Sequence, residues 1–246
     1  MQEQMYHYFH NVEDAHWWFQ GRREIVTALI ERYYPKKGEK SCKVLDLGCS
    51  TGMMLSALQK YGSVWGMDKS KQAIEYASKK VPEANLILGS FPEQMPKGQF
   101  DLITALDVIE HLDDDRQALS KLADALKPNG ILVVTAPAFP FLWTSHDDVN
   151  WHKRRYSLPE LKQKILDANL EIKKISYYNT FLFFPIAVAK LFSRSLLRSR
   201  EAHVSNTPPP AIFNLPLRIL FSLEKYFLPF VNFPFGISLI AAASKK

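Results

Sequence analysis

The sequence has few cysteines, no long uninterrupted apolar run and no internal repeat. Among 246 residues, Cys42 and Cys49 are the two cysteines, which are too few for a disulfide framework and favour a reducing setting. Pro185 and Lys190 interrupt the longest apolar segment, residues 181–192, which is also too short to span a bilayer. The first residues have no signal-peptide character. We therefore expect a cytoplasmic protein without a membrane-spanning segment.

Charge is distributed unevenly along the chain. The sequence has 31 lysines and arginines against 25 acidic residues, and basic side chains gather at residues 153–155 and 190–200. A basic surface can attract an anionic membrane or a nucleic acid. The length suits one domain with an elaboration, and the apolar content of 47% suffices for a core on both faces of a sheet.

Short apolar runs alternate with helical patterns through the middle of the chain, which is typical of a parallel sheet covered by helices. The expected strands are residues 43–47, 63–67, 85–88, 100–105 and 130–135, and the expected helices are 52–61, 70–80 and 114–126. A capping box at residues 157–160 begins a helix that reaches Asn169, and strands follow at 171–178 and 235–243. Upstream, a helix over residues 25–34 ends before Pro35.

These boundaries divide the chain into four expected parts. Residues 1–40 are a helical N-terminal cap, 41–179 the core, 180–234 an apolar and basic helical insertion, and 235–246 the final core strand. Hairpin loops are normally short, so an insertion of more than fifty residues between the last two strands is usually functional or disordered. Its apolar composition argues against disorder.

The most informative segment joins the first expected strand to the helix that follows. Asp46 precedes a turn in which the small residues Gly48, Ser50 and Gly52 alternate, and Asp68 ends the next strand. Glycines allow a ligand to approach the backbone, and the later acid can hold a ribose diol. Because Asp46 would repel a phosphate, the turn favours a cofactor with a cationic amino-acid end over a dinucleotide. S-adenosylmethionine has these groups, and an ordinary strand-to-helix turn is the alternative interpretation.

The turn resembles the first motif of the class I S-adenosylmethionine-dependent methyltransferases, an acid followed by three alternating glycines, with Ser50 in place of the middle glycine. Further matches follow in order at Asp68 and at residues 86–91, 100–112 and 126–134. The resemblance implies a Rossmann-like, doubly wound α/β fold whose seven-stranded sheet is mostly parallel with one antiparallel edge strand. It also implies S-adenosylmethionine as the cofactor and S-adenosylhomocysteine as the product.

The resemblance assigns cofactor-binding roles to residues of these motifs. Ser90 stands where the family usually places an acid that contacts the adenine amino group, and Phe91 could pack on the adenine face. The expected set is Asp46, Gly48, Cys49, Ser50, Gly52, Asp68, Lys69, Ser90, Phe91, Asp107 and Val108.

Upstream of the core, the aromatic residues 17–19 would form a lid over the cofactor, with Trp18 at its centre. Arg22 or Arg23 is available to pair with the cofactor carboxylate. Apolar attachment of a helix to the sheet is the alternative role for these aromatic residues.

The catalytic candidates are His111, His152 and Tyr156. Methyl transfer from a sulfonium needs alignment, desolvation and at most a base, so no catalytic triad is expected. His111 is either a general base or a residue that packs at the start of a helix. His152, Arg155 and Tyr156 resemble a D…H-x-R-R-Y pattern in a bacterial and archaeal branch of the family. They would bind an anionic substrate or close the pocket, unless the loop is simply a solvated basic segment.

A metal site is a rival interpretation of the same loop. His146, Asp147 and His152 are permissible ligand types, but their spacing matches no tight ligand motif. We therefore expect no metal.

The segment after the fourth expected strand bears on the substrate. Residues 106–110 have the sequence LDVIE, whereas enzymes that methylate DNA adenines or release factors often carry Asn/Asp-Pro-Pro-Tyr/Phe there. The sequence of this segment resembles the corresponding segment of small-molecule and lipid methyltransferases, so we expect a small-molecule or lipid-like methyl acceptor. The alternatives are an RNA methyltransferase, a non-catalytic S-adenosylmethionine-binding scaffold subunit and, more remotely, a dehydrogenase. Nucleic acid is disfavoured as a partner because only the net charge supports it.

The insertion at residues 180–234 contains two amphipathic stretches rich in phenylalanine and leucine, with lysines and arginines alongside. Such stretches suit an anionic membrane surface, and we expect peripheral attachment to the inner face of the membrane. The same stretches could enclose a long-chain substrate, contact another subunit or pack on a core of their own.

Overall fold

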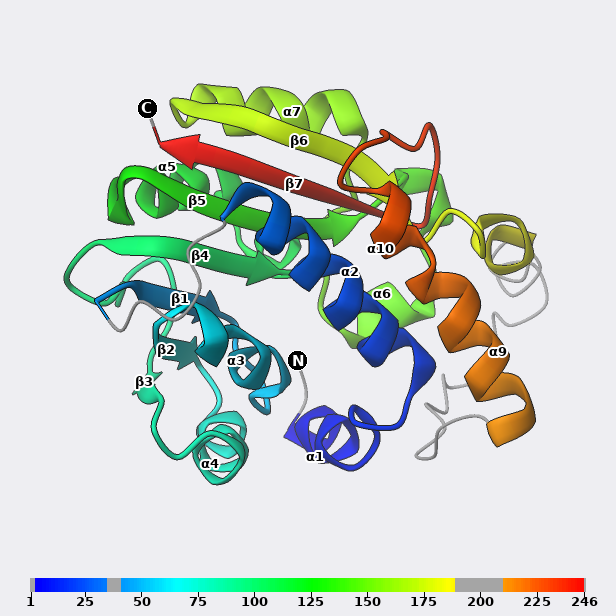
Figure 1. Ribbon diagram of the computed structural model, residues 1–246, viewed down its shortest axis with the longest axis horizontal. Coiled ribbons are helices and arrows are strands. Elements are labelled where there is room, and N and C mark those ends of the chain that lie inside the picture. The colour runs from blue at the N-terminus through cyan, green and yellow to red at the C-terminus, as the bar shows by residue number, and fades with distance from the viewer. Residues whose placement is uncertain (1–2, 35–40, 189–209, 246) are drawn as a thin grey trace.

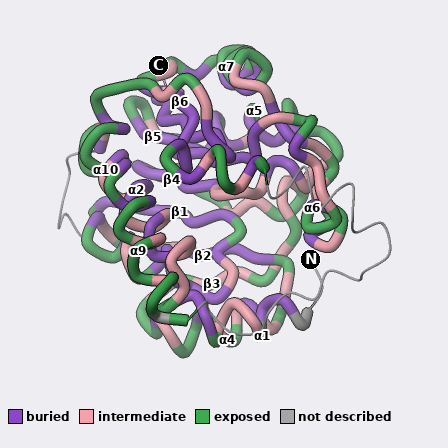
Figure 2. The backbone as a smooth tube through the Cα atoms, turned by 90° about the vertical axis from the view of Figure 1, so that its right-hand side faces the viewer, coloured by how far each residue is buried: buried purple, intermediate pink, exposed green. Residues whose placement is uncertain are grey.

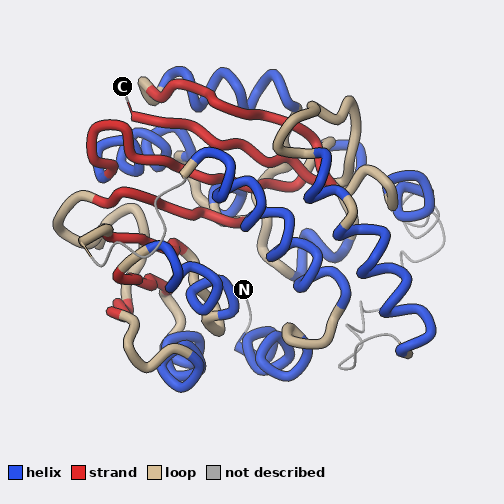
Figure 3. Tube along the Cα trace, in the orientation of Figure 1, coloured by secondary structure: helices blue, strands red, loops and turns tan. Residues whose placement is uncertain are grey.

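The computed structural model describes residues 3–34, 41–188 and 210–245, and within them a single sheet carries helices on both faces (Figures 1 and 3). Its order is β3-β2-β1-β4-β5-β7-β6. The strands are β1 Lys43–Leu47, β2 Ser63–Asp68, β3 Asn85–Leu88, β4 Phe100–Leu106, β5 Leu126–Pro137, β6 Leu170–Tyr178 and β7 Ser238–Lys245. The predicted Rossmann-like α/β fold is confirmed.

The last two strands form the expected antiparallel pair at one border of the sheet. β7 runs antiparallel to both β5 and β6, while the pairs among β1 to β5 are parallel. β7 lies between its two partners, so β6 is the outermost strand and the antiparallel strand is one position further in.

The helices fill the intervals between the strands and the two elaborations. They are α1 Glu3–Val12, α2 Trp17–Tyr33, α3 Met53–Leu58, α4 Lys71–Lys80, α5 Asp115–Ala125, α6 Ser145–Val149, α7 Leu158–Asp167, α9 Ala211–Ser222 and α10 Glu224–Phe227, with short 3-10 turns at Gln59–Tyr61, Ile109–His111 and Pro140–Leu142. Residues 183–188 are also helical. None of the helices in the described ranges has both the length and the apolar character needed to cross a bilayer.

α2 begins eight residues earlier than the sequence predicts. His16 caps it, because its ring nitrogen accepts a hydrogen bond from the backbone N–H of Trp18 at 3.2 Å. The aromatic residues 17–19 therefore form the first turn of α2. Residues 35–40, which include the expected stop at Pro35, lie outside the described residues.

Alternate side chains of the strands point to opposite faces and build two separate core layers. On one face, Val44 and Val133 pack in the same cluster as Leu29 of α2. On the other face, Leu45 and Val134 belong to the cluster that contains residues of α5 and α7. All strands except the edge strand β3 are accordingly buried along most of their length, as Figure 2 shows.

The N-terminal cap and the insertion contact each other on one face of the sheet, where α2 and α9 lie side by side (Figure 1). Asn214 of α9 accepts a hydrogen bond from the backbone N–H of Trp17 and donates one to the carbonyl of Ala15, both at 2.8 Å. Gly21 of α2 packs so closely on Phe221 that an added Cβ would lie 2.5 Å from the ring. Two parts far apart in the sequence thus form one layer.

A buried carboxylate ties the insertion to the end of β6. Glu224 of α10 accepts hydrogen bonds from the backbone N–H groups of Asn179, Thr180 and Phe181, at 2.7, 2.6 and 3.0 Å. The expected basic stretch at residues 190–200 lies outside the described residues.

Candidate active site

A cavity of about 980 Å³ opens at the carboxyl ends of the parallel strands. Asp46, Asp68 and Leu106 line it from the ends of β1, β2 and β4. The N-terminal cap contributes a second wall, and Leu182, Pro185 and Ile186 together with Leu217 of α9 contribute a third. This is the place where open α/β sheets bind ligands.

The turn after β1 explains the alternating small residues. Gly48, Ser50 and Gly52 all have positive φ angles, of +70°, +50° and +91°. A Cβ on Gly48 would lie 2.7 Å from a methyl group of Val108, and one on Gly52 would lie 3.0 Å from the backbone of Ala77. Gly48 therefore keeps the backbone open on the cavity side, whereas Gly52 allows α3 to pack on α4.

Asp46 is nearly buried at the end of β1, with 3% of its surface exposed. Burial raises the pKa of its carboxyl to about 7, although the Thr104 hydroxyl donates a hydrogen bond to it at 2.6 Å. A buried carboxylate with little compensation favours a cationic ligand in the cavity.

Asp68 is held rigidly at the end of β2. It accepts hydrogen bonds from the backbone N–H groups of Ser50 and Ser70, at 3.0 and 2.9 Å, and from the Tyr6 hydroxyl at 3.3 Å. Burial raises its pKa, and these hydrogen bonds oppose the rise. The Ser50 hydroxyl beside it is buried without a hydrogen-bond partner among the described residues.

These features fit the groups of S-adenosylmethionine. The carboxylates of Asp46 and Asp68 suit an ammonium and a ribose diol, and the turn at residues 48–52 has no basic side chain for a phosphate. Phe91 lines the cavity beyond Asp68, where an apolar ring surface suits adenine.

Arg22 links the N-terminal cap to the loop after β4. Its guanidinium forms an ion pair with Asp107 at 2.8 Å and lies 5.0 Å from the ring centre of Trp18. Asp107 has a φ of +55°, and its carboxylate accepts a hydrogen bond from the Thr135 hydroxyl at 2.9 Å. Trp18, Arg22 and Asp107 all line the cavity, so a ligand carboxylate would meet an arginine that is already paired.

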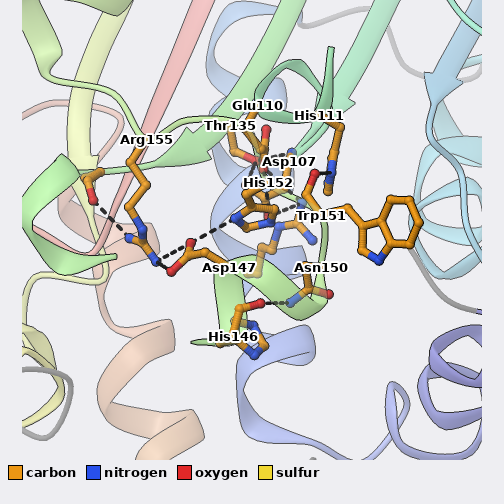
Figure 4. A network of polar contacts seen from close by, with 12 residues as sticks. Asp107, Glu110, His111, Thr135, His146, Asp147, Asn150, Trp151, His152 and Arg155 are labelled. Atoms are coloured by element: carbon orange, nitrogen blue, oxygen red, sulfur yellow. Dashed lines mark hydrogen bonds and ion pairs between the residues drawn. The ribbon is translucent and has the colours of Figure 1, made fainter. Parts of the chain in front are cut away.

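Two histidines, His111 and His152, lie close together in the lining of the cavity (Figure 4). The rings of His111 and His152 have centres 4.9 Å apart. Nδ1 of His152 lies 2.9 Å from the carboxylate of Asp147, and Nδ1 of His111 lies 3.2 Å from the carbonyl oxygen of Trp151. Burial lowers the pKa of His111 to about 4, which keeps its ring neutral at physiological pH.

Asp147 organises this side of the cavity. Arg155 contacts it at 2.7 Å and also donates to the carbonyl of Ala138 at 3.0 Å, while the backbone N–H of Thr144 donates to it at 2.8 Å. Burial alone would raise the pKa of Asp147, but the hydrogen bonds from His152 and Arg155 outweigh burial and hold it well below its usual range.

Comparison with known proteins agrees with this geometry. Residues 45–134 match the family described as a methyltransferase domain. The matched segment runs from β1 into β5 and includes the glycine turn and Asp68. The ubiquinone biosynthesis O-methyltransferase of Bradyrhizobium diazoefficiens is 34% identical over 98 residues, which are 38% of this chain and 39% of that protein. The chain thus spans about two fifths of the length of that relative.

Two further matches cover more of the chain than residues 45–134. The ubiquinone biosynthesis O-methyltransferase of Rickettsia typhi is 26% identical over 63% of this chain and 69% of its own length. The N-methyltransferase NodS of Bradyrhizobium japonicum, solved with S-adenosylhomocysteine, superposes with a TM-score of 0.56 at 13% identity, covering 92% of this chain and 87% of NodS. The structural likeness shows the shared fold.

The structure places most of the predicted site residues around one cavity. Its lining includes Asp46, Gly48, Cys49, Ser50, Asp68, Lys69, Phe91, Asp107, Val108, Trp18, Arg22, His111 and His152. Gly52 and Ser90 are absent from the described lining. The backbone N–H of Ser90 instead donates to the side chain of Gln94 at 2.7 Å.

Tyr156 does not take the catalytic place that the sequence predicts for it. Its side chain is fully buried outside the cavity lining, and its hydroxyl donates to Asp115 at 2.8 Å. Burial raises its pKa far above the usual range, so Tyr156 is a core residue that positions the loop. Arg155 is likewise engaged with Asp147, which leaves it poorly placed to bind an anionic substrate.

Sequence reasoning missed one contributor, Tyr6, and left the role of a second, Glu110, open. Tyr6 reaches Asp68 from α1, sixty-two residues away, and no local pattern indicates that contact. Glu110 is completely buried beside the two histidines, and burial raises its pKa well above the usual range. An acid in a mostly apolar segment next to a histidine was the available signal.

Proposed function

We propose that this protein is an S-adenosylmethionine-dependent methyltransferase that acts on a small-molecule or lipid-linked acceptor. The observation that carries the proposal is the pair of buried carboxylates, Asp46 and Asp68, at the ends of neighbouring strands and facing one cavity. Asp46 would hold the ammonium end and Asp68 the ribose hydroxyls. When bound, the cofactor supplies a methyl group that is activated by its sulfonium.

The protein's own contribution is alignment and exclusion of water. Trp18 and Arg22 of the cap cover the cavity beside the glycine turn, and Trp17 packs edge-on against Phe221 of α9 at 5.7 Å. Both roles expected for the aromatic cluster, a cover for the cofactor and an attachment of the helix, are compatible with these contacts.

The acceptor is proposed to bind between the histidines and the insertion. His111 and His152 supply polar groups on one wall, and Leu182, Ile186 and Leu217 supply an apolar wall opposite the sheet. The curated relatives are named as O-methyltransferases of ubiquinone biosynthesis, which supports a hydroxyl acceptor on a lipid-like molecule.

Calorimetry with S-adenosylmethionine and S-adenosylhomocysteine tests the cofactor. We expect binding of both, and turnover assays with cell-extract fractions should then give a methylated lipid or small molecule. A methylated RNA would establish the RNA methyltransferase, and cofactor binding without product in any fraction would support the scaffold. A folded protein that binds NAD but neither sulfur compound would overturn the proposal in favour of a dehydrogenase.

We also propose that the insertion attaches the protein to an anionic membrane, at its inner face. Ile212 and Phe213 at the start of α9 are 75% and 62% exposed, and Phe184 is also exposed next to the cavity-lining Pro185. Exposed apolar side chains beside a substrate wall suit an acceptor that enters from a lipid surface.

Flotation with anionic and neutral vesicles tests the membrane proposal. The full chain should float with anionic vesicles, and the double variant Ile212→Ser, Phe213→Ser should float less. Leu166→Ser is the matched control, because Leu166 is an exposed apolar residue of α7 on the opposite face of the sheet. Equal flotation of all three proteins, or no flotation of any, contradicts membrane attachment by α9.

A further inference from the structure

Three potential metal ligands converge on the acceptor side of the cavity. Glu110, His111 and His152 each offer one ligand atom, and these atoms all lie within 4.8 Å of one another. The first two follow β4, while His152 follows α6 some forty residues later. Figure 4 shows the three side chains gathered at one point.

Glu110 has no other evident partner. Its side chain is 0% exposed, and within the described ranges neither carboxylate oxygen accepts a hydrogen bond from another residue. Nε2 of His152 lies 4.0 Å from Oε1 of Glu110, which is beyond hydrogen-bond distance. A buried carboxylate in this state is costly unless a charge or a donor compensates it.

The hydrogen bonds of the two histidines fix which nitrogen is free. A carboxylate and a carbonyl oxygen only accept hydrogen bonds, so Asp147 and Trp151 require that Nδ1 carry the proton in His152 and His111. Each neutral ring then presents the lone pair of Nε2. Histidines that bind metals are oriented in this way, with the other ring nitrogen donating to a carboxylate or a carbonyl.

We propose that Glu110, His111 and His152 bind one divalent transition-metal cation. Nitrogen and oxygen ligands lie about 2.0–2.2 Å from such an ion and hence up to roughly 4.4 Å from one another, which small side-chain rotations would achieve. Two histidines and one carboxylate suit Zn²⁺, Mn²⁺, Fe²⁺ or Co²⁺. The sequence predicted no metal because the set joins two segments, and only one of its members belongs to the trio considered there.

The role of this cation in catalysis rests on the proposed methyltransferase function and adds a substrate class to it. All three residues line the cavity, so the remaining coordination positions face the acceptor. A bound cation would lower the pKa of an acceptor hydroxyl, whose proton passes to solvent water. The oxygen then forms the new bond to the methyl carbon, while the carbon–sulfur bond breaks and its electron pair remains on sulfur. The acceptor class is therefore a hydroxyl compound that can bind a metal as its anion.

Cobalt binding to the full chain tests the site without any need for turnover. After treatment with a chelator, the protein should bind Co²⁺ at one equivalent, with a visible absorption band, and Zn²⁺ should displace it. Glu110→Gln and His152→Gln should abolish the band, and Asp147→Asn should weaken binding by about 10–100-fold, since it removes the partner that orients His152. His146→Ala is the matched control, because His146 lines the same cavity outside the trio.

The outcomes separate this proposal from the methyltransferase proposal. If the protein binds cobalt as expected but has no affinity for S-adenosylmethionine, the metal-site proposal stands and the methyltransferase proposal fails. Cofactor binding with no cobalt band, or a band that survives in folded Glu110→Gln and His152→Gln, overturns the metal site. Circular dichroism establishes that each variant is folded.

Discussion

The two sides of the cavity are built in opposite ways. On the cofactor side, Asp46, the glycine turn and Asp68 come from one continuous stretch of two strands and one helix. On the acceptor side, His111, His152 and the insertion residues Leu182, Ile186 and Leu217 come from segments up to about one hundred residues apart in the chain. The first side is a local motif that a sequence can display, and the second exists only after the chain has folded.

Among these changes, removal of the Asp68 carboxylate should cause the largest loss of cofactor affinity. In Asp68→Asn the ribose hydroxyls lose a charged acceptor, so affinity for S-adenosylhomocysteine should fall by about 30–100-fold, in line with about 2–3 kcal/mol for a hydrogen bond to a charged group. Calorimetry measures the change. Asp101→Asn is the control, because Asp101 is also a nearly buried carboxylate but lies at the start of β4, away from the cavity. Equal losses in both variants would show that the effect is structural.

The pH dependence of binding should be the next largest effect. Burial raises the pKa of Asp46 to about 7, and a cationic ammonium binds the ionised form, so affinity should rise with pH. The ionised fraction changes from about 0.1 at pH 6 to about 0.9 at pH 8, which corresponds to about a tenfold gain in affinity. Calorimetry across this range checks it, with Asp46→Asn expected to bind weakly and without that gain. A flat profile in the unsubstituted protein contradicts the role of Asp46.

Substitution of Arg22, which lies between the cofactor side and the acceptor side, tests its contribution to cofactor binding. Because Arg22 is paired with Asp107 at 2.8 Å, a cofactor carboxylate gains only part of the arginine's charge. Arg22→Ala should therefore weaken cofactor binding by about threefold to tenfold, within the range of one charged hydrogen bond that is partly compensated. Arg23→Ala, its neighbour in α2, should have no effect on affinity. Loss of folding in Arg22→Ala would instead indicate a role in attaching the cap.

The smallest effect is expected at Ser50, where the sequence departs from the family motif. Its φ of +50° is one that glycine adopts without strain, so Ser50→Gly should fold normally and retain cofactor affinity within about twofold. Gly48→Ala provides the contrast, since φ is +70° there and the added methyl would meet Val108 at 2.7 Å. Thermal unfolding with and without S-adenosylhomocysteine distinguishes the two variants. A large loss of affinity in Ser50→Gly would assign the buried hydroxyl a direct contact.

The same contrast explains how far the sequence could predict the structure. β1 and β3 have the predicted bounds, because each contains a short apolar run that ends at a glycine, Gly48 after β1 and Gly89 after β3. β5 begins at Leu126 instead of 130, because Leu126 pairs with Phe100 through a register shift that only the neighbouring strand defines. The early start of α2 likewise depends on the His16 cap, and a run of three aromatic residues has no helical periodicity to reveal it.

The acceptor side shows where sequence reasoning ends. His111 and His152 were separate candidates, and nothing in their spacing indicates that their rings meet at 4.9 Å. That contact depends on the path of the loop after β5. There Asp147 closes the capping box of α6 with Thr144 and at the same time binds Arg155 and His152. Tyr156, the neighbouring candidate, turns into the core, where its hydroxyl donates a hydrogen bond to Asp115.

The side chain of Asn214 bonds to the backbone on both sides of His16, the residue that caps α2, and this has a consequence for ligand exchange. Any displacement of α2 that admits the methyl donor must carry α9 with it, because the side-chain amide holds Trp17 and Ala15 together. Donor and acceptor would then share one entrance, and occupancy by either would alter the exchange rate of the other.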